Sequence, residues 1–184
     1  MDSERQKLII VGGSPATGKT TLAMRLENDL GIKRVSMDEI KERLFDSGGY
    51  RDRDWSKEIG RLAWPVFKGL VELNIKRGND VIADATFLWA DDYLWLNQLK
   101  EEYDLDLIQF WMTAPPDVRR DRFVNRANNE RHPGHCDSLE SVMQEFESRF
   151  FSKTFIPSPI NGKTKIVDTT DFSAVDHDEI LGWI

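Results

Sequence analysis

The sequence predicts an α/β fold in which helices cover both faces of a mainly parallel β-sheet. Short apolar runs alternate with amphipathic segments of helical period, and turn signals such as Gly31, Gly78 and Pro115-Pro116 separate them. Strands that alternate with helices form parallel sheets through right-handed crossovers. No linker rich in Pro, Gly or Ser divides the chain, so we expect a single domain over residues 1–184.

Five apolar runs are the expected strands. The first, from Lys7 to Val11, is apolar on both faces, as strands inside a parallel sheet are, and it stops at Gly12-Gly13. The strands are expected at residues 7–11, 33–36, 80–83, 105–112 and 165–167.

Apolar residues at helical spacing predict the segments between the strands. In the first of these, Leu22, Ala23, Leu26 and Leu30 share one face. Pro65 is expected to make the longest helix irregular, because proline lacks the N–H that a helix interior uses. Helices are expected at residues 20–30, 38–45, 55–76, 91–103, 117–131, 138–151 and 176–184, and a loop at residues 46–56.

Composition and charge exclude several classes of protein. Apolar residues make up 40% and charged residues 31% of the chain, which is usual for soluble globular domains. The formal net charge of −7 provides no general attraction for nucleic acid, although a local basic cleft is compatible with it. A single Cys excludes an intramolecular disulfide. Because no stretch approaches 18 apolar residues, we expect a cytoplasmic protein without a membrane segment.

A glycine-rich motif follows the first expected strand. Residues 13–20 match the pattern G-x-x-x-x-G-K-[ST] at every fixed position. Glycines let backbone N–H groups point at phosphate oxygens, and the start of the next helix adds its positive end. Lys19 would place a charge on the β and γ phosphates, and Thr20 would ligate Mg²⁺. The predicted site for ATP and Mg²⁺ is Gly13, Ser14, Pro15, Ala16, Thr17, Gly18, Lys19, Thr20 and Thr21.

This motif predicts nucleotide binding but does not choose between kinases, GTPases and motor ATPases. A GTPase would carry an Asn-Lys-x-Asp motif for its base, and the nearest approach, Asn161-Gly162-Lys163-Thr164, lacks the Asp. A small kinase needs three further groups: a base for the acceptor hydroxyl, an acid near the metal, and mobile cations over the transferred phosphoryl group. The sequence offers candidates for all three.

Two carboxylates follow expected strands, at the edge of the sheet where ligands bind in such folds. Asp38 comes after the second strand and is the candidate to accept the proton of the acceptor hydroxyl. Its alternative role is to cap the helix that begins at Glu39. Asp84 ends the third strand and is the candidate to orient Mg²⁺ or its waters, and its alternative is an ordinary cap at a strand end.

Five arginines between Arg119 and Arg131 are the candidate mobile cations. Arg122 and Arg126 lie four residues apart, so they share a helix face. Guanidinium groups suit phosphoryl oxygens, and a lid that brings this pair over the γ phosphate would exclude water. A solvated helix face is expected to account for Arg119 or Arg120. The predicted catalytic residues are Lys19, Asp38, Arg122 and Arg126.

With these residues in place, the chain resembles the polynucleotide 5′-kinase branch of the P-loop kinases, whose relatives include zeta toxins and chloramphenicol phosphotransferase. The likeness runs from Leu8 to about Phe150. Gly13 to Thr20 is similar to the family's phosphate loop, Asp38 to its general base, and Arg122-x-x-x-Arg126 to its lid. Lys41 falls where polynucleotide kinases carry a substrate-binding Arg.

The resemblance implies a three-layer α/β/α P-loop NTPase fold, with a five-stranded parallel sheet in the order 2-3-1-4-5 and a helical lid at about residues 117–137. It implies transfer of the γ-phosphate of ATP to a hydroxyl-bearing substrate, with a nucleic-acid 5′ end among the candidates. Asp84-Ala85-Thr86 resembles the family's Asp-x-Thr-Asn-Leu segment. The implied substrate-binding residues are Asp38, Lys41, Asp84 and Thr86, and the implied metal ligands are Thr20 and Asp84.

Three departures from the family pattern loosen the choice of acceptor. Lys41 in place of Arg loses bidentate phosphate recognition but keeps the charge. Phe87 stands where the family has Asn, and the segment from Asn128 to His135 resembles an extended lid. Asp168-Thr169-Thr170 lies where relatives place the loop that contacts adenine. The resemblance thus supports a hydroxyl acceptor without securing nucleic acid.

Two clusters have competing explanations. His132, His135 and Cys136 lie within five residues, but no second pair of ligands accompanies them, so lid contacts or simple turn residues are favoured over zinc. An aromatic cluster after the third strand would either stack on a base or pack in the core. It consists of Trp89, Tyr93 and Trp95.

Two classes of function stay open. The first is a kinase that acts on a nucleic-acid 5′ end, a nucleotide sugar, or a small metabolite or antibiotic. The second is a regulatory module that binds and slowly hydrolyses ATP without an acceptor. The acidic net charge argues against long nucleic acid and the Asp38-x-x-Lys41 match argues for it. The oligomeric state is not predicted.

Overall fold

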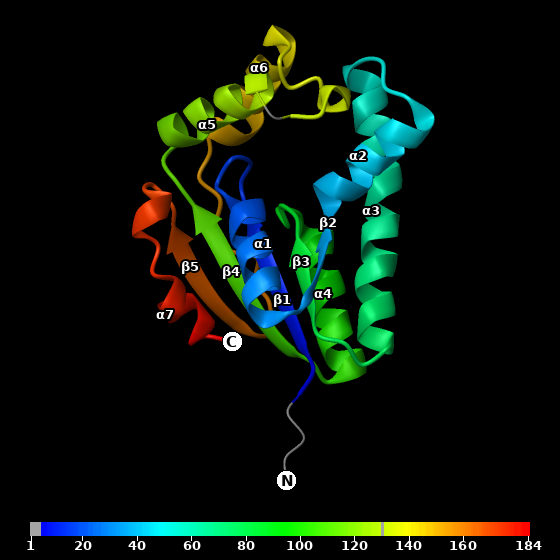
Figure 1. Ribbon diagram of the computed structural model, residues 1–184, viewed down its shortest axis with the longest axis vertical. Coiled ribbons are helices and arrows are strands. Elements are labelled where there is room, and N and C mark those ends of the chain that lie inside the picture. The colour runs from blue at the N-terminus through cyan, green and yellow to red at the C-terminus, as the bar shows by residue number, and fades with distance from the viewer. Residues whose placement is uncertain (1–4, 130) are drawn as a thin grey trace.

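The computed structural model describes residues 5–129 and 131–184. Its centre is a five-stranded parallel sheet in the order β2-β3-β1-β4-β5 (Figure 1). The predicted fold and strand order are therefore confirmed. The strands are β1 (Lys7–Gly13), β2 (Lys33–Ser36), β3 (Val81–Asp84), β4 (Asp106–Thr113) and β5 (Lys163–Asp168).

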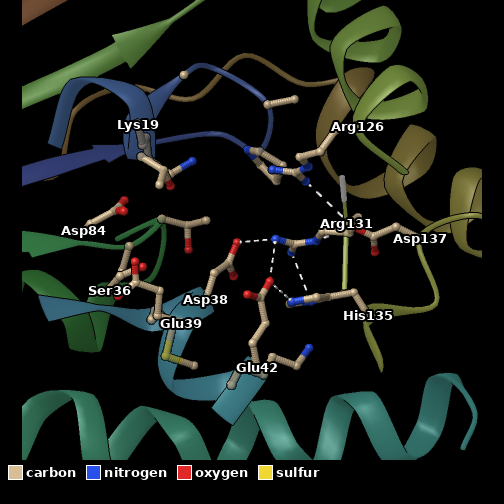
Figure 2. Close-up of a pocket in the computed structure, with 18 of the residues that line it drawn as sticks. Lys19, Ser36, Asp38, Glu39, Glu42, Asp84, Arg126, Arg131, His135 and Asp137 are labelled. Atoms are coloured by element: carbon tan, nitrogen blue, oxygen red, sulfur yellow. Dashed lines mark hydrogen bonds and ion pairs between the residues drawn. The ribbon is translucent and has the colours of Figure 1, made fainter. Parts of the chain in front are cut away.

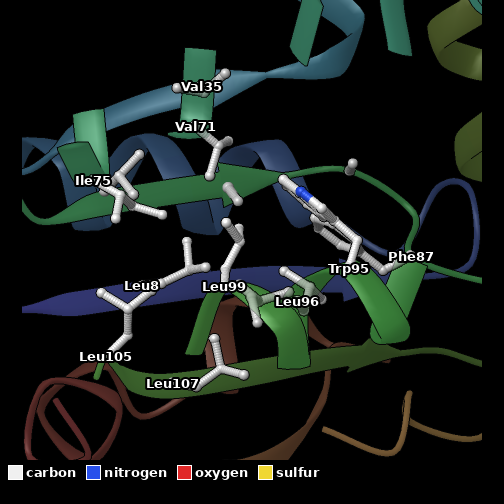
Figure 3. Packing of buried hydrophobic residues seen from close by; sticks show 14 of the residues in the cluster. Leu8, Val35, Val71, Ile75, Phe87, Trp95, Leu96, Leu99, Leu105 and Leu107 are labelled. Atoms are coloured by element: carbon white, nitrogen blue, oxygen red, sulfur yellow. The ribbon is translucent and has the colours of Figure 1, made fainter. Parts of the chain in front are cut away.

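Helices cover both faces of the sheet and complete three layers (Figure 1). One face packs against α3 (Arg53–Lys76) and α4 (Ala90–Tyr103), and Leu8 lies in the middle of the resulting core (Figure 3). The other face packs against α1 (Lys19–Leu30) and α7 (His177–Leu181). Because both faces are covered, the central strands are apolar on both sides.

The remaining helical elements follow the carboxyl ends of the strands, where the lid was expected (Figure 1). Glu130, inside the predicted lid at 117–137, lies outside the described residues. In the part of the chain that the structure describes, no helix is long and apolar enough to cross a membrane. These elements are α2 (Met37–Gly48), α5 (Pro116–Asn129), η1 (Pro133–His135), α6 (Glu140–Phe146), the π turn η2 (Glu147–Phe151) and η3 (Phe172–Ala174).

Three details differ from the prediction. Most of the stretch 46–56 is helical, because α2 continues to Gly48 and α3 begins at Arg53. The side chain of Asp52 caps α3 by accepting a hydrogen bond of 2.8 Å from the Trp55 N–H. Pro65 lies inside α3 without interrupting it. The helix expected at residues 138–151 is the short α6, which widens into the π turn η2.

Candidate active site

The phosphate loop connects β1 to α1 and depends on two glycines with positive φ. Gly13 has φ 131°, and a Cβ atom there would lie 2.3 Å from the carbonyl oxygen of Met112. Gly18 has φ 83°, and a Cβ atom there would lie 2.8 Å from the ring of Phe172. Any larger side chain would meet both strain and a clash. The two fixed glycines of the motif are therefore required by the backbone of the loop.

Neighbouring side chains brace this loop. The Thr17 hydroxyl donates to the Ser14 carbonyl at 2.9 Å, and Lys19 Nζ donates to the same carbonyl at 2.8 Å. From outside the loop, Arg119 Nη1 donates to Ser14 Oγ at 2.5 Å, and the Thr169 hydroxyl donates to the Thr17 carbonyl at 2.9 Å. The loop is thus held in shape before any nucleotide binds.

A cavity of about 770 Å³ opens above the phosphate loop. The loop and α1 form its floor, α2 and α3 form one wall, and α5, η1 and α6 form the other (Figure 2). The structure brings the predicted site residues together around this cavity. Among them, only Gly13, Ser14 and Thr17 do not line it, because they belong to the inner side of the loop.

Asp84 lies at the end of β3 and is 4% exposed. Burial raises its pKa to about 6, against the opposing effects of the Lys19 charge and a hydrogen bond from Thr20. Arg34 Nη1 lies 3.5 Å from Asp84 Oδ2, which has no hydrogen-bond partner among the described residues. An unpartnered carboxylate oxygen beside a hydroxyl is a donor set that suits Mg²⁺. The residues present therefore fit the predicted metal.

Asp38 lies in the first turn of α2. Its alternative role as a helix cap is wrong, because Ser36 occupies the cap position. The carboxylate faces Lys19 across the cavity and accepts a hydrogen bond of 2.7 Å from Arg131 Nη1 (Figure 2). The enclosing protein alone would raise the pKa of Asp38, but the charges of Arg131 and His135 hold it well below the usual range. Asp38 is therefore ionised at neutral pH.

Arg131 is the centre of an ion-pair network that joins the lid to α2 (Figure 2). Besides Asp38, its guanidinium contacts Asp137 at 3.0 Å and Glu42 at 3.6 Å. It also lies 3.0 Å from His135 Nδ1, and His135 Nε2 lies 3.0 Å from Glu42. Arg131 was named in the sequence only as one cation of five, yet it is the one in contact with Asp38.

The two arginines of the predicted lid pair, Arg122 and Arg126, contact different parts of the protein. Arg126 lies 3.7 Å from Asp137, and its Nε has no hydrogen-bond partner in the described part of the chain (Figure 2). Arg122 Nη2 donates to the carbonyls of Thr169 at 2.6 Å and Thr170 at 3.3 Å. Both arginines line the cavity. Arg126 keeps free donor capacity, whereas Arg122 holds the segment after β5.

The two remaining arginines of α5 differ in burial. Arg120 forms a half-exposed ion pair with Glu147, as expected for a solvated face. Arg119 is 4% exposed, and besides Ser14 its Nη1 donates to the Phe150 carbonyl at 3.2 Å. The solvated face thus accounts for Arg120, whereas Arg119 supports the phosphate loop.

Lys41 and Thr86 both line the cavity. Lys41 lies on the α2 side, which we call the acceptor end, and Thr86 lies beside the phosphate loop. Lys41 Nζ donates to Ser56 Oγ at 3.0 Å and lies 5.4 Å from the centre of the Phe45 ring. Burial lowers the pKa of Lys41 to about 8. The Thr86 carbonyl accepts the Gly13 N–H at 3.1 Å and so ties the segment after β3 to the phosphate loop.

The aromatic residues after β3 turn away from the cavity. Phe87 has φ 48° and is fully buried, with its ring centre 6.0 Å from that of Phe67 (Figure 3). Trp95 packs in the same core. Trp89 is 54% exposed, and neither it nor Tyr93 lines the cavity. Phe87 therefore makes no acceptor contact here, and stacking on a substrate at this cavity has no support.

The residues from His132 to Cys136 make packing and polar contacts that connect the lid to α2. The His132 ring stacks on Phe45 with ring centres 5.4 Å apart, and Cys136 is buried. Within residues 5–129 and 131–184, no three His, Cys, Asp or Glu side chains are grouped as a metal site would need. His135 belongs to the Arg131 network instead.

Sequence reasoning missed Arg34, Glu42 and Asp137. A signal existed for Arg34, because alternation along β2 places it on the same face as Ser36, which lines the cavity. No sequence pattern points to Glu42 or Asp137, because Arg131 brings these two carboxylates together only in the folded protein.

Comparison with known proteins agrees with this geometry. The family model AAA_33, described as an AAA domain, matches residues 8–151. A solved structure from Chloroflexus aurantiacus J-10-fl, provisionally assigned as a kinase, is 32% identical. It covers 98% of this chain and 97% of its own, with a TM-score of 0.87.

Curated relatives are more distant. An uncharacterised protein of Mycobacterium tuberculosis H37Rv is 28% identical over 152 residues, which is 78% of this chain and 29% of the relative. The chain thus spans less than a third of the length of that relative. A cytidylate kinase of Methanopyrus kandleri AV19 is 27% identical over 179 residues, covering 92% of this chain and 81% of the relative. Since the family model matches most of the chain, and the phosphate loop and strand order agree with it, this protein belongs to the AAA_33 family of P-loop kinases.

Proposed function

We propose that this chain is an ATP-dependent phosphotransferase that moves the γ-phosphate of ATP to a hydroxyl group of a small acceptor. One observation carries the proposal. The Asp38 carboxylate faces Lys19 of the phosphate loop across a single cavity, and Arg126 and Arg131 reach in from the lid (Figure 2). An ionised carboxylate at this position can accept a hydrogen bond from the hydroxyl of an acceptor and orient its oxygen toward the γ phosphate.

The nucleotide would lie along the loop from Gly13 to Thr21. Burial lowers the pKa of Lys19 to about 8, so Lys19 stays cationic at neutral pH and would contact the β and γ phosphates. The unpartnered Nε of Arg126 would donate to the γ phosphate from the lid. These cations would oppose the negative charge on the phosphoryl oxygens during transfer.

Thr20 and Asp84 would hold Mg²⁺. The unpartnered Asp84 Oδ2 and the cavity-lining Thr20 supply the oxygens that such an ion prefers. Mg²⁺, when bound, neutralises phosphate charge. Because burial raises the pKa of Asp84 to about 6, its carboxylate is available to a cation above that pH.

Asp38 would accept a hydrogen bond from the acceptor hydroxyl and orient its oxygen toward the γ-phosphorus. The new O–P bond forms as the bond from the γ-phosphorus to the β–γ bridging oxygen breaks, ADP leaves, and the hydroxyl proton passes to Asp38. Arg131, now 2.7 Å from Asp38, would turn toward the phosphate before the acceptor binds.

Polar contacts bridge the acceptor end of the cavity and support a small acceptor over a long nucleic acid. Arg53 of α3 forms an ion pair with Glu145 of α6 at 3.0 Å, and His135 Nε2 of η1 lies within hydrogen-bond distance of Glu42 of α2, at 3.0 Å. A polymer strand would have to break these contacts between the wall and the lid. A nucleic-acid 5′ end is the alternative acceptor, because the cationic Lys41 lines the same end.

Product analysis tests the proposal. The protein is incubated with γ-labelled ATP, Mg²⁺ and separate pools of hydroxylated metabolites and 5′-hydroxyl oligonucleotides. We expect label in a new phosphate ester from the metabolite pool. Asp38→Asn should lower transfer about 10²- to 10⁴-fold with unchanged ATP affinity by calorimetry. Asp91→Asn, a change of an exposed carboxylate in the first turn of α4, should leave transfer unchanged.

Each other outcome has a clear meaning. Label only in free phosphate contradicts the phosphotransferase and selects the hydrolysing module. Label on the oligonucleotide contradicts the small acceptor and selects the nucleic-acid alternative. Full transfer by the Asp38→Asn variant removes Asp38 from the reaction.

A further inference from the structure

The outer face of α3 carries an apolar stripe. Leu62, Val66, Leu70 and Leu73 are 58%, 45%, 38% and 40% exposed. Their spacing of three or four residues places them on one side of the helix. The other side, which includes Phe67, is buried against the sheet. A contiguous apolar surface of this kind on a globular domain indicates an interaction site.

Gly69 lies within this stripe. A Cβ atom there would meet nothing within 4 Å, so the space in front of it is open. A glycine inside a helix costs about 1 kcal/mol relative to alanine, and it allows another backbone to approach closely. Figure 1 shows α3 at the outer edge of the molecule.

Charges of opposite sign flank the stripe. Glu58 lies one turn before Leu62, and Arg77 lies one turn after Leu73. Both side chains are exposed. Within its own helix Glu58 contacts Arg61. A helix with an acidic group at one end of an apolar stripe and a basic group at the other is complementary to an antiparallel copy of itself.

We infer that α3 docks antiparallel against α3 of a second copy of this chain, about a twofold axis through the middle of the stripe. The centre of the apolar residues sets the register, in which Leu62 faces Leu73 of the partner subunit and Val66 faces Gly69 of the partner subunit. The same register brings Glu58 to Arg77 of the partner subunit. Twofold symmetry makes each contact occur twice.

This docking leaves the candidate active site accessible. Arg53 and Gly60 line the cavity from the inner side of α3, away from the stripe. From Glu58 to Arg77 the surface is about 29 Å long, at 1.5 Å per residue. One helix from each subunit forms an interface at the small end of the stable range, so we expect a dissociation constant in the micromolar range.

Sedimentation velocity of the full chain over concentrations on the order of 1 to 100 µM tests the interface. We expect a shift from monomer to dimer. Leu70→Glu should abolish the dimer, because two carboxylates would be buried near the axis. Val124→Glu, at a 42% exposed position on α5, is the matched control and should leave the dimer intact. A wild-type protein that is monomeric throughout, or a dimer that resists Leu70→Glu, overturns the inference.

Charge exchange tests the register. Glu58→Arg alone and Arg77→Glu alone each place like charges opposite one another twice, so each should weaken association about three- to tenfold. The double variant Glu58→Arg/Arg77→Glu should restore it. Failure of the double variant to recover overturns the antiparallel pairing. Neither residue lines the cavity, so turnover of ATP should be unchanged in all three variants.

Discussion

The nucleotide side and the acceptor side of the cavity are built by different means. The phosphate loop is one continuous segment, residues 13–20, whose shape follows from two glycines and from hydrogen bonds to the Ser14 carbonyl. The acceptor side is assembled from α2, α3 and the lid, and its central contact joins Asp38 to Arg131, 93 residues away. The phosphate loop can be recognised from a continuous sequence pattern, whereas a long-range ion-pair network can be recognised only in the completed fold.

The two sides also differ in how readily their contacts exchange. Ser14 and Thr17 are 5% and 1% exposed, so their hydrogen bonds are shielded from water. The side chain of Asp38 is 44% exposed within the cavity, whereas that of its partner Arg131 is 13% exposed. A bound phosphate can replace Asp38 as the partner of Arg131, because it offers the guanidinium the same negative charge. We expect a rigid nucleotide side and an exchangeable acceptor side.

Among the lid arginines, Arg126→Ala should have the largest effect on the acceptor side. Its Nε is unpartnered and its pKa is lowered by burial, which leaves it poised for an anion in the cavity. If it stabilises the phosphoryl group in flight, turnover should fall about 10²- to 10³-fold while the KM for ATP changes little. Steady-state kinetics with the acceptor found by product analysis measure both constants.

Arg120→Ala is the matched control on the same helix. Arg120 forms only a half-exposed pair with Glu147, so its loss should leave both constants unchanged. An Arg126→Ala variant whose KM for ATP rises as much as its turnover falls would place Arg126 on the nucleotide side and remove the contrast between the two sides.

The dependence of activity on acid pH should test the role of Asp84 on the nucleotide side. Burial raises the pKa of Asp84 to about 6, so below that pH the carboxyl is protonated and loses the negative charge that would hold Mg²⁺. We expect kcat/KM for ATP to fall about tenfold per pH unit below about pH 6. Asp84→Asn should retain only residual activity without this acid limb. An acid limb that persists in the variant would belong to another group.

Much of the fold was accessible from the sequence because its signals are local. Apolar runs such as Lys7 to Val11 are long enough to identify buried strands, and the order of the sheet followed once the chain resembled a known family. The phosphate loop was located to the residue for the same reason. Asp52 shows the limit of prediction from apolar periodicity, since α3 begins directly after this cap, two residues earlier than expected.

The acceptor side was harder to predict because its chemistry depends on tertiary contacts. Arg119 and Arg120 are adjacent and identical, yet one is buried against the phosphate loop and the other is solvated. Arg131 lies outside the helical spacing that singled out Arg122 and Arg126, and its role is visible only once α2 is placed beside the lid. Helix periodicity predicts which residues share a face of a helix, but it does not predict which part of the protein that face contacts.

Arg122→Ala should give the smallest effect. It tests directly whether Arg122 and Arg126 have different roles. Arg122 Nη2 donates to the carbonyls of Thr169 and Thr170, and Thr169 in turn holds the phosphate loop through the Thr17 carbonyl. Loss of these bonds should loosen the nucleotide side and raise the KM for ATP about three- to tenfold, because one hydrogen bond contributes on the order of 1 kcal/mol. Turnover at saturating ATP should change little.

The conservative change Arg122→Lys separates support from catalysis at this position. A lysine can keep one bond to the Thr169 carbonyl, so KM should return part of the way toward the wild-type value. If instead Arg122→Ala lowers turnover as strongly as Arg126→Ala does, both guanidinium groups act on the phosphoryl group. In that case the contact with Thr169 is a resting position that Arg122 leaves when the nucleotide binds, and the nucleotide side is as exchangeable as the acceptor side.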